Sequence, residues 1–313
     1  MPARRPTSVN DMTALRPSTR IAKAHGTGNS FVVYTDADDT NDIDAVEVRR
    51  LCSSAFGIGA DGLMRAVMKD GRWFMDYRNS DGSIAEMCGN GIRVFVDHLR
   101  REGLMTDEEI EVGTRGGVRT VRVIDQGGEA EVLYRVDMGP ARSSGTADID
   151  VTIPGIEQTL RGVYVDMPNP HTVVALAGEE ELHNIIFPAT DASEAPEVMR
   201  PTYAPSNERG TNLEAVVDLT GPEDQSGHIR LRVLERGVGE TLACGTGCCA
   251  AALATAIRRG EGAPASWIVD VPGGRVWVDL DGVLSWENGQ PHVTDASVIL
   301  TGPATRVATF ELV

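Results

Sequence analysis

Short runs of β-branched and other apolar residues, alternating with polar positions, recur along the chain between glycine-rich turns. A few longer segments instead carry apolar residues at helical spacing. From Ile21 to the last residues, no linker or low-complexity segment separates these elements. The pattern predicts an α/β (α+β) body built from short strands and a few helices.

Two helices are predicted to begin in the same way. The first begins with Cys-Gly-Asn-Gly at 88–91, ends near Gly103 and carries four apolar residues at helical spacing: Ile92, Phe95, Val96 and Leu99. The second begins with Cys-Gly-Thr-Gly at 244–247 and ends near Gly260. Two basic residues precede the final glycine in both.

The segments that follow these helices also match. Each consists of an alternating strand, a Gly-Gly turn and a second alternating strand, centred on Gly116-Gly117 and Gly273-Gly274. The two cysteines are 156 residues apart, the Gly-Gly turns 157, and the next turns, at Asp125 and Asp281, again 156. Three landmarks at one offset indicate an internal repeat, so we expect two pseudo-symmetric lobes.

Composition limits the classes of partner. The 313 residues carry a formal net charge of −17, which disfavours nucleic acid because proteins that neutralise phosphates usually show a basic stripe. The longest near-apolar run, Cys248 to Ile257, is about half as long as a membrane span requires. Residues 1–20 lack the apolar core of a secretory signal and are expected to form a disordered extension.

The chain has five cysteines, an odd number that favours reduced thiols in the cytoplasm over a disulfide scaffold. Cys52, Cys248 and Cys249 are expected to be inert packing residues. Cys88 and Cys244 differ from these because each stands at a glycine-rich helix start.

The two helix starts suggest acid and base chemistry. Glycines after each cysteine leave the first N–H groups of the helix open to a carboxylate, and the helix dipole is expected to lower the pKa of both thiols. If Cys88 and Cys244 face each other across one carbon, one removes a proton and the other supplies one to the opposite face, which inverts that carbon. This chemistry requires neither a metal nor an organic cofactor.

Other kinds of site fit the sequence less well. The cysteines after 243 lack the repeated knuckle spacing of a zinc site, and CGNG and CGTG lack the GxGxxG pattern of a dinucleotide loop. The acidic run Asp36–Asp44 is predicted to be a solvated loop, because a calcium loop would have glycine where Asn41 stands. The proline-rich segment from His183 to Pro205 predicts a surface excursion.

Longer motifs around both cysteines resemble those of the diaminopimelate epimerase family, from about Ile21 to the last residues. They are KAHGTGNSFVV from Lys23, GIGADG from Gly57, RNSDGSIAEMCGNGIR from Arg78, MPNPH from Met167, ERGTN from Glu208, ERGVGETLACGTG from Glu235 and TGPATRV from Thr301. The related proline racemases and hydroxyproline epimerases typically have His where this chain has Asn90, and phenazine-type isomerases of the same fold lack the cysteine pair.

The resemblance implies a pyridoxal-independent isomerase that interconverts LL- and meso-2,6-diaminopimelate in the route to lysine and peptidoglycan. It also implies a homodimer, and two lobes that are each a curved, mainly antiparallel sheet or barrel around a central helix. We expect one lobe at 21–138 with a returning strand at 298–313, and the other at 139–297.

The resemblance further implies roles for single residues, with Cys88 and Cys244 as the acid/base thiols. The carboxylate at the reacting carbon would be held by Asn90 with the amides of Gly89 and Gly91, and by Thr246 with the amide of Gly245. His171 and Glu235 would lie beside the reacting amino group. The distal amino acid group would be bound by Asn29, Asn79, Asn169, Asn212 and Arg236.

These assignments have structural alternatives. Asn29 and Asn79 are also typical of turns, His171 of a satisfied loop imidazole, and Glu235-Arg236 of an exposed ion pair. His98, far along the first helix, is expected to be structural.

Two residues depart from the family pattern: Ser30 stands where Asp is usual, and Pro168 where Gly is common. Two other functions stay open. One is a racemase or epimerase of another amino acid, of the proline or hydroxyproline type. The other is a non-catalytic amino acid binding protein.

Overall fold

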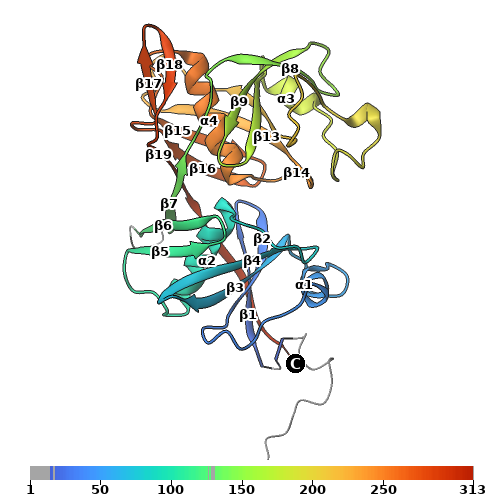
Figure 1. Ribbon diagram of the computed structural model, residues 1–313, viewed down its shortest axis with the longest axis vertical. Coiled ribbons are helices and arrows are strands. Elements are labelled where there is room, and N and C mark those ends of the chain that lie inside the picture. The colour runs from blue at the N-terminus through green and yellow to red at the C-terminus, as the bar shows by residue number, and fades with distance from the viewer. Residues whose placement is uncertain (1–14, 17, 126, 128–130, 313) are drawn as a thin grey trace, which may run out of the picture. The chain divides into compact units, whose positions relative to one another are not determined.

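The computed structural model describes residues 15–16, 18–125, 127 and 131–312. The chain divides into unit 1, which runs to Tyr134 and resumes at Ala304, and unit 2, Arg135–Pro303 (Figure 1). The boundaries expected after residues 138 and 297 differ from these. The expected boundaries fall within β7 (Leu133–Pro140) and β19 (Ser297–Pro303), and these two strands pair with each other.

The expected N-terminal extension, 1–20, lies mainly outside the described residues, which omit 1–14 and 17. Its described part is ordered against unit 1. Leu15 is buried in a cluster with Ile21, and the N–H of Ser18 donates to the carbonyl of Leu312 at 2.8 Å. Arg20 already belongs to the first strand.

Unit 1 is a curved sheet around a buried central helix. Its strands are β1 (Arg20–Gly26), β2 (Asn29–Thr35), β3 (Gly62–Lys69), β4 (Arg72–Asn79), β5 (Glu109–Thr114), β6 (Gly117–Ile124) and β20 (Thr305–Glu311). Its helices are α1 (Ala45–Cys52) and α2 (Gly89–Arg101). β2 pairs with β3, and β4 with β5, in parallel; β1 pairs antiparallel with both β2 and β20. α2 contacts β1, β2, β3 and β20, and the four apolar residues that predicted it are buried.

Unit 2 repeats this arrangement with more strands. These are β8 (Ala147–Thr152), β9 (Leu160–Asp166), β10 (Pro170–Ala175), β11 (Thr202–Ala204), β12 (Asn212–Asp218), β13 (Gly227–Glu235), β14 (Gly239–Thr241), β15 (Ser266–Val271), β16 (Gly274–Asp279), β17 (Leu284–Glu287), β18 (Gln290–Val293) and β19. Its helices are α3 (Glu179–Asn184), a 3-10 turn at Glu197–Met199 and α4 (Gly245–Arg259). β10 pairs with β12, and β13 with β15, in parallel. The antiparallel pairs are β8–β9, β8–β11, β9–β10, β12–β13, β13–β14, β15–β16 and β16–β19.

The internal repeat is visible in the strands that follow each central helix. β5 and β6 form a tight hairpin with Thr114 opposite Gly117, and β15 and β16 form another with Val271 opposite Gly274. In each unit the helix lies in the chain between two strands that pair in parallel, β4 and β5 or β13 and β15. The predicted central helices and hairpins are therefore confirmed.

The acidic run Asp36–Asp44 is folded around an arginine. Arg65 of β3 is buried, and its guanidinium pairs with Asp36 at 2.8 Å and with Asp76 of β4 at 3.0 Å. Asp44 caps α1 by accepting hydrogen bonds from two N–H groups of its first turn. The prediction of a solvated loop was wrong for Asp36, which is buried against a cation from a neighbouring strand, whereas Asp38, Asp39 and Asp42 are exposed.

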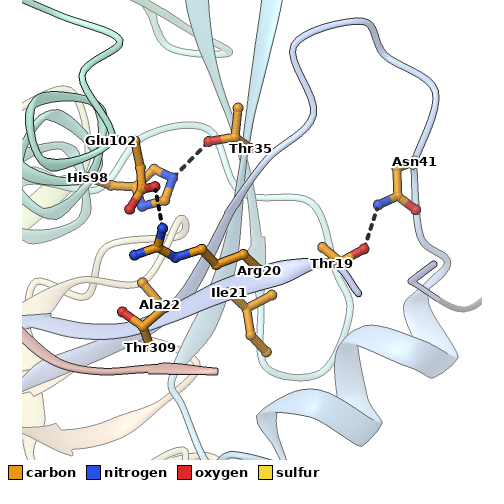
Figure 2. A pocket seen from close by; sticks show the side chains of 9 residues that line it. All are labelled: Thr19, Arg20, Ile21, Ala22, Thr35, Asn41, His98, Glu102 and Thr309. Carbon is orange, nitrogen blue, oxygen red and sulfur yellow. Dashed lines mark hydrogen bonds and ion pairs between the residues drawn. The ribbon is translucent and has the colours of Figure 1, made fainter. Parts of the chain in front are cut away.

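His98 lies near the C-terminal end of α2, beside a cavity of about 210 Å³ (Figure 2). Arg306 donates to its Nδ1 at 3.3 Å, so its Nε2–H donates to the hydroxyl of Thr35 at 2.9 Å. Burial, and then the charge of Arg306, lower the pKa of His98 to about 4. The imidazole is therefore neutral at pH 7, and its contacts fit the expected structural role.

No helix in the described ranges of the chain is long and apolar enough to cross a membrane.

Replacing Arg65 by Met should lower the free energy of unfolding of unit 1 by about 3–5 kcal/mol, because the buried carboxylate of Asp36 loses its ion-pair partner and Asp76 is left with Arg78 and Arg115. Arg72→Met provides the control, since Arg72 pairs with Glu111 on the surface and its loss should cost under about 1 kcal/mol. Chemical denaturation measures both. Equal, small losses would contradict the role given to Arg65.

Candidate active site

Both cysteines of the repeated motif occupy the N-cap position of a central helix. α2 begins directly after Cys88 and α4 directly after Cys244, and both caps have extended backbone, with φ/ψ of −138°/118° and −121°/118°. Each cap carbonyl accepts the first helical hydrogen bond, at 2.9 Å. The predicted helix starts are confirmed, and each thiol lies at the positive end of a helix dipole.

Cys88 is half-buried, and its sulfur contacts Gly91 and Asn29. The N–H of Gly91 donates to it at 3.3 Å, and the thiol donates to Oδ1 of Asn29 at 3.5 Å. The N–H of Gly91 favours the thiolate, and the amide oxygen of Asn29 favours the protonated thiol. Cys88 is thus held between groups that can stabilise either protonation state.

Asp61, which is not among the predicted site residues, holds Asn29 in place. One carboxylate oxygen of Asp61 accepts from Nδ2 of Asn29 at 3.1 Å and from the N–H of Ser30 at 2.7 Å. The Ser30 hydroxyl donates to the same oxygen at 3.1 Å. These bonds direct the amide oxygen of Asn29 toward Cys88, and Ser30, one of the departures from the family pattern, takes part in them.

Asn90, in the first turn of α2, is buried. Its amide oxygen accepts from Nη2 of Arg93 at 2.6 Å, and Nε of Arg93 donates to the carbonyl of Gly89 at 3.3 Å. Arg93 is itself fully buried, so it fixes the turn from the inside. Gly91 faces the same interior, since a Cβ there would lie 3.3 Å from the Cβ of Cys88 and from the sulfur of Met64.

Asn79 ends β4 and closes a turn. Its N–H donates to the carbonyl of Ser83 at 2.9 Å, and its Nδ2 donates to the hydroxyl of Ser83 at 3.0 Å. The turn reaches the Asp61 loop, because the N–H of Ser80 donates to the carbonyl of Asp61 at 3.0 Å. These contacts are those of a turn residue, which was the alternative to substrate binding. The substrate role of Asn79 stays a prediction.

Three strands and the start of α4 form the site of unit 2. The parallel pairing of β10 with β12 places His171 opposite Asn212, and β13 runs beside β12 to end at Glu235. All three strands contact α4. The fold therefore gathers, around Cys244, residues that lie up to 73 positions before it in the chain.

His171 is completely buried and bonded at both ring nitrogens. Its Nδ1 lies 2.7 Å from Oε1 of Glu214, and its Nε2 lies 3.2 Å from Oδ1 of Asn169. His171 is therefore a satisfied imidazole that also lies within the predicted site. Glu214 is buried as well and was not among the predicted site residues.

Burial raises the pKa of the Cys244 thiol well above its ordinary value, and the charges of Glu235 and Glu214 raise it further. The hydroxyl of Thr246, 3.4 Å from the sulfur, offsets part of this effect. The expectation of a lowered pKa at the helix start was wrong for Cys244, because desolvation and two carboxylates outweigh the helix dipole.

Glu235 is bonded to the hydroxyl of Thr241 and is not an exposed ion pair with Arg236. Burial raises its pKa, and the nearby charge of Glu214 contributes to the same direction, while Thr241 opposes it. A carboxyl group of this kind exchanges a proton closer to neutral pH than an exposed glutamate does.

Two of the residues predicted to bind the distal part of the substrate, Asn212 and Arg236, are held by contacts with the backbone. Oδ1 of Asn212 accepts from the N–H of Arg236 at 2.8 Å. The guanidinium of Arg236 donates to the carbonyl of Arg209 and packs over Gly210, where a Cβ would lie 2.8 Å from its Cδ. The structure thus brings Asn169, His171, Asn212 and Arg236 together.

Glu214 had one signal in the sequence. It is the single charged residue in the otherwise apolar run Leu213–Val217 of a buried strand. Buried carboxylates are rare without a partner, which marks such a position for attention. Among the residues that the structure describes, no group of three or more His, Cys, Asp or Glu side chains is arranged to hold a metal ion.

Comparison with known proteins identifies relatives over nearly the whole chain. The family model for diaminopimelate epimerase matches residues 21–144 and 163–294. A diaminopimelate epimerase from Streptomyces coelicolor is 38% identical, over 94% of this chain and 96% of its own. Another, from Rhodococcus opacus, is 41% identical, over 88% of this chain and 95% of its own.

Solved structures with low sequence identity share the fold. A phenazine biosynthesis protein of the PhzF family from Bacillus anthracis aligns with a TM-score of 0.64 at 15% identity, over 94% of this chain and 99% of its own. A hydroxyproline epimerase from Agrobacterium vitis aligns with a TM-score of 0.60 at 15% identity, over 94% and 92%. The expected two-lobed α/β fold is confirmed, and by the sequence matches this chain belongs to the diaminopimelate epimerase family.

Proposed function

We propose that this chain interconverts LL-2,6-diaminopimelate and meso-diaminopimelate by proton transfer between the α-carbon and two thiols, those of Cys88 and Cys244. The observation that carries the proposal is the repeated cysteine N-cap at a glycine-rich helix start. Its context is a family whose members at 38–41% identity carry the name of that activity.

In the proposed reaction, one sulfur acts as a thiolate and takes the proton from the α-carbon. The other acts as a thiol and gives its proton to the opposite face. One C–H bond breaks and one forms, so the carbon is inverted and the two sulfurs exchange protonation states with no net change in protons. The costly species is the carbanion beside the carboxylate, which the N–H groups of the helix starts would stabilise.

Cys244 suits the role of the thiol. It is buried among carboxylates that disfavour its thiolate, so it begins as the proton donor. Cys88 is more exposed and accepts a backbone N–H at its sulfur, which suits the proton acceptor. Because the two states exchange on each turnover, they must be reset before the same direction runs again.

The binding groups follow from the same proposal. The reacting carboxylate would meet Asn90 with the amides of Gly89 and Gly91, and Thr246 with that of Gly245. His171 and Glu235 would face the reacting amino group. The distal amino acid group would be bound by the remaining polar residues: Asn29, Asn79, Asn169, Asn212 and Arg236.

We further propose that the protein works as a homodimer in the cytoplasm, on a free small molecule that leads to lysine and peptidoglycan precursors. It would need no pyridoxal cofactor, no metal and no nucleic acid partner. The five cysteines form no disulfide, as the reaction requires, and the net charge of −17 disfavours a polyanion.

Purified protein incubated with LL-diaminopimelate in D₂O should form the meso isomer with deuterium at the inverted centre. The deuterium arises because the donated proton comes from a thiol that has exchanged with solvent. Chiral chromatography with mass spectrometry measures both isomer and label. Failure to convert the substrate, or conversion without label, would reject the proposed reaction.

Arg236→Ala should lower kcat/KM for diaminopimelate on the order of 100-fold, because a charge-assisted bond to the distal carboxylate is worth about 3 kcal/mol. Arg230→Ala is the matched control, since Arg230 lies on β13 but pairs with Glu179 and Asp270 on the surface. A racemase of an amino acid without a second carboxylate would not need Arg236. Unchanged kcat/KM in Arg236→Ala would therefore favour that alternative.

A further inference from the structure

Glu214 is a buried carboxylate for which the proposed reaction has no role. It lies near the middle of β12, opposite Val173 of β10, in a strand whose neighbouring residues are apolar. Its side chain is completely buried, and only one of its two oxygens has a hydrogen-bond partner among the described residues. Burying a carboxylate in such a place costs free energy unless its contacts compensate for the lost solvation.

The first contact is with His171. Oε1 of Glu214 lies 2.7 Å from Nδ1, while Asn169 occupies Nε2. A carboxylate at Nδ1 holds a proton on that nitrogen and fixes the ring in one orientation. Both ring nitrogens face acceptor oxygens, so the His171 ring cannot rotate freely within the site.

The second contact is with the first turn of α4. A Cβ placed on Gly247 would lie 2.7 Å from Oε1 of Glu214 and 3.4 Å from the sulfur of Cys244. The carboxylate and the thiol thus approach the same point from two sides. This contact also explains why residue 247 is glycine, because any side chain there would collide with Glu214.

Other titratable groups lie near Glu214 or near the Cys244 thiol. β13 contributes Glu235, and β10 contributes His171. Burial raises the pKa of Tyr203 of β11, and the charge of Glu214 raises it further. Cys248 and Cys249 follow in α4 itself, and both are buried and form no disulfide. Of these groups, Glu214 has no hydrogen-bond partner for its second oxygen, Oε2, among the described residues.

We propose that Glu214 is a positioning residue that holds Cys244 in its thiol form and fixes the His171 ring. It acts through its negative charge against the first turn of α4 and through its bond to Nδ1. The catalytic consequence of this inference rests on the proposed function. The effect of Glu214 on the thiol does not depend on any substrate. The raised pKa of Cys244, to which Glu214 contributes, agrees with this role.

The test measures the thiol directly. Iodoacetamide reacts with the thiolate, and peptide mapping separates label on Cys244 from label on the other cysteines. Glu214→Gln keeps the size of the side chain and removes its charge. Alkylation of Cys244 at pH 7.5 should become faster on the order of tenfold, and its pH midpoint should move to lower pH.

Two variants serve as controls. Asp218→Asn removes a charge from the same strand, but Asp218 pairs with Arg259 at the other end of α4, so Cys244 should react as in the wild type. Glu214→Asp keeps the charge and should retain a midpoint near that of the wild type. In the wild type itself, ¹⁵N NMR should show a proton on Nδ1 of His171 from pH 6 to 9, a result that does not depend on any variant folding.

An unchanged midpoint in folded Glu214→Gln would overturn the inference, as would a His171 ring without a proton on Nδ1. If the midpoint moves as expected but the wild type does not convert diaminopimelate, the proposed function fails while the role of Glu214 stands. If both hold, the alkaline limb of the pH profile for kcat should also move to lower pH in Glu214→Gln, because the acid form of Cys244 is lost sooner.

Discussion

The start of a buried helix carries unpaired N–H groups that need acceptors, while the dry interior around it disfavours negative charge. Both central helices of this protein meet that constraint with a cysteine N-cap followed by glycines. A thiol suits the position because it can carry the charge or release it. The remaining site residues are arranged around the two helix starts, and the surrounding sheets serve to bury them.

The two units resolve the constraint with different charges. Beneath the first turn of α2 lies a buried cation, Arg93, bonded to Asn90 and to the carbonyl of Gly89. Beneath that of α4 lies a buried carboxylate, Glu214. The repeat in sequence is thus close to symmetric, while the electrostatic surroundings of the two thiols are not. Such a difference suits a reaction that needs one acid and one base at a time.

Local sequence predicted much of this structure. The spacing of Ile92, Phe95 and Leu99 predicted α2, and the glycines at 116 and 273 predicted the two hairpins, because both signals depend on residues close in the chain. The motifs that resemble the family identified both cysteines and the polar residues around them. The boundaries of the two units lie a few residues from the expected ones, at the start of β7 and the end of β19.

Contacts that depend on pairing between distant strands could not be predicted in this way. Glu214 meets His171 because β10 and β12 pair in parallel, 43 residues apart in the chain. Arg65 gathers the acidic run because β3 lies beside the strand that precedes that run. The pKa of Cys244 was misjudged for the same reason: the helix dipole is visible in the sequence, but burial and the carboxylates of other strands are not.

The central claim is that one thiol from each repeat is needed for turnover. The most direct measurement compares the epimerase kcat of Cys88→Ala and Cys244→Ala with that of Cys52→Ala, a free cysteine of the α1 core. The account predicts a loss of at least about 100-fold in each of the first two and little change in the third. Full activity in either Cys88→Ala or Cys244→Ala would contradict it.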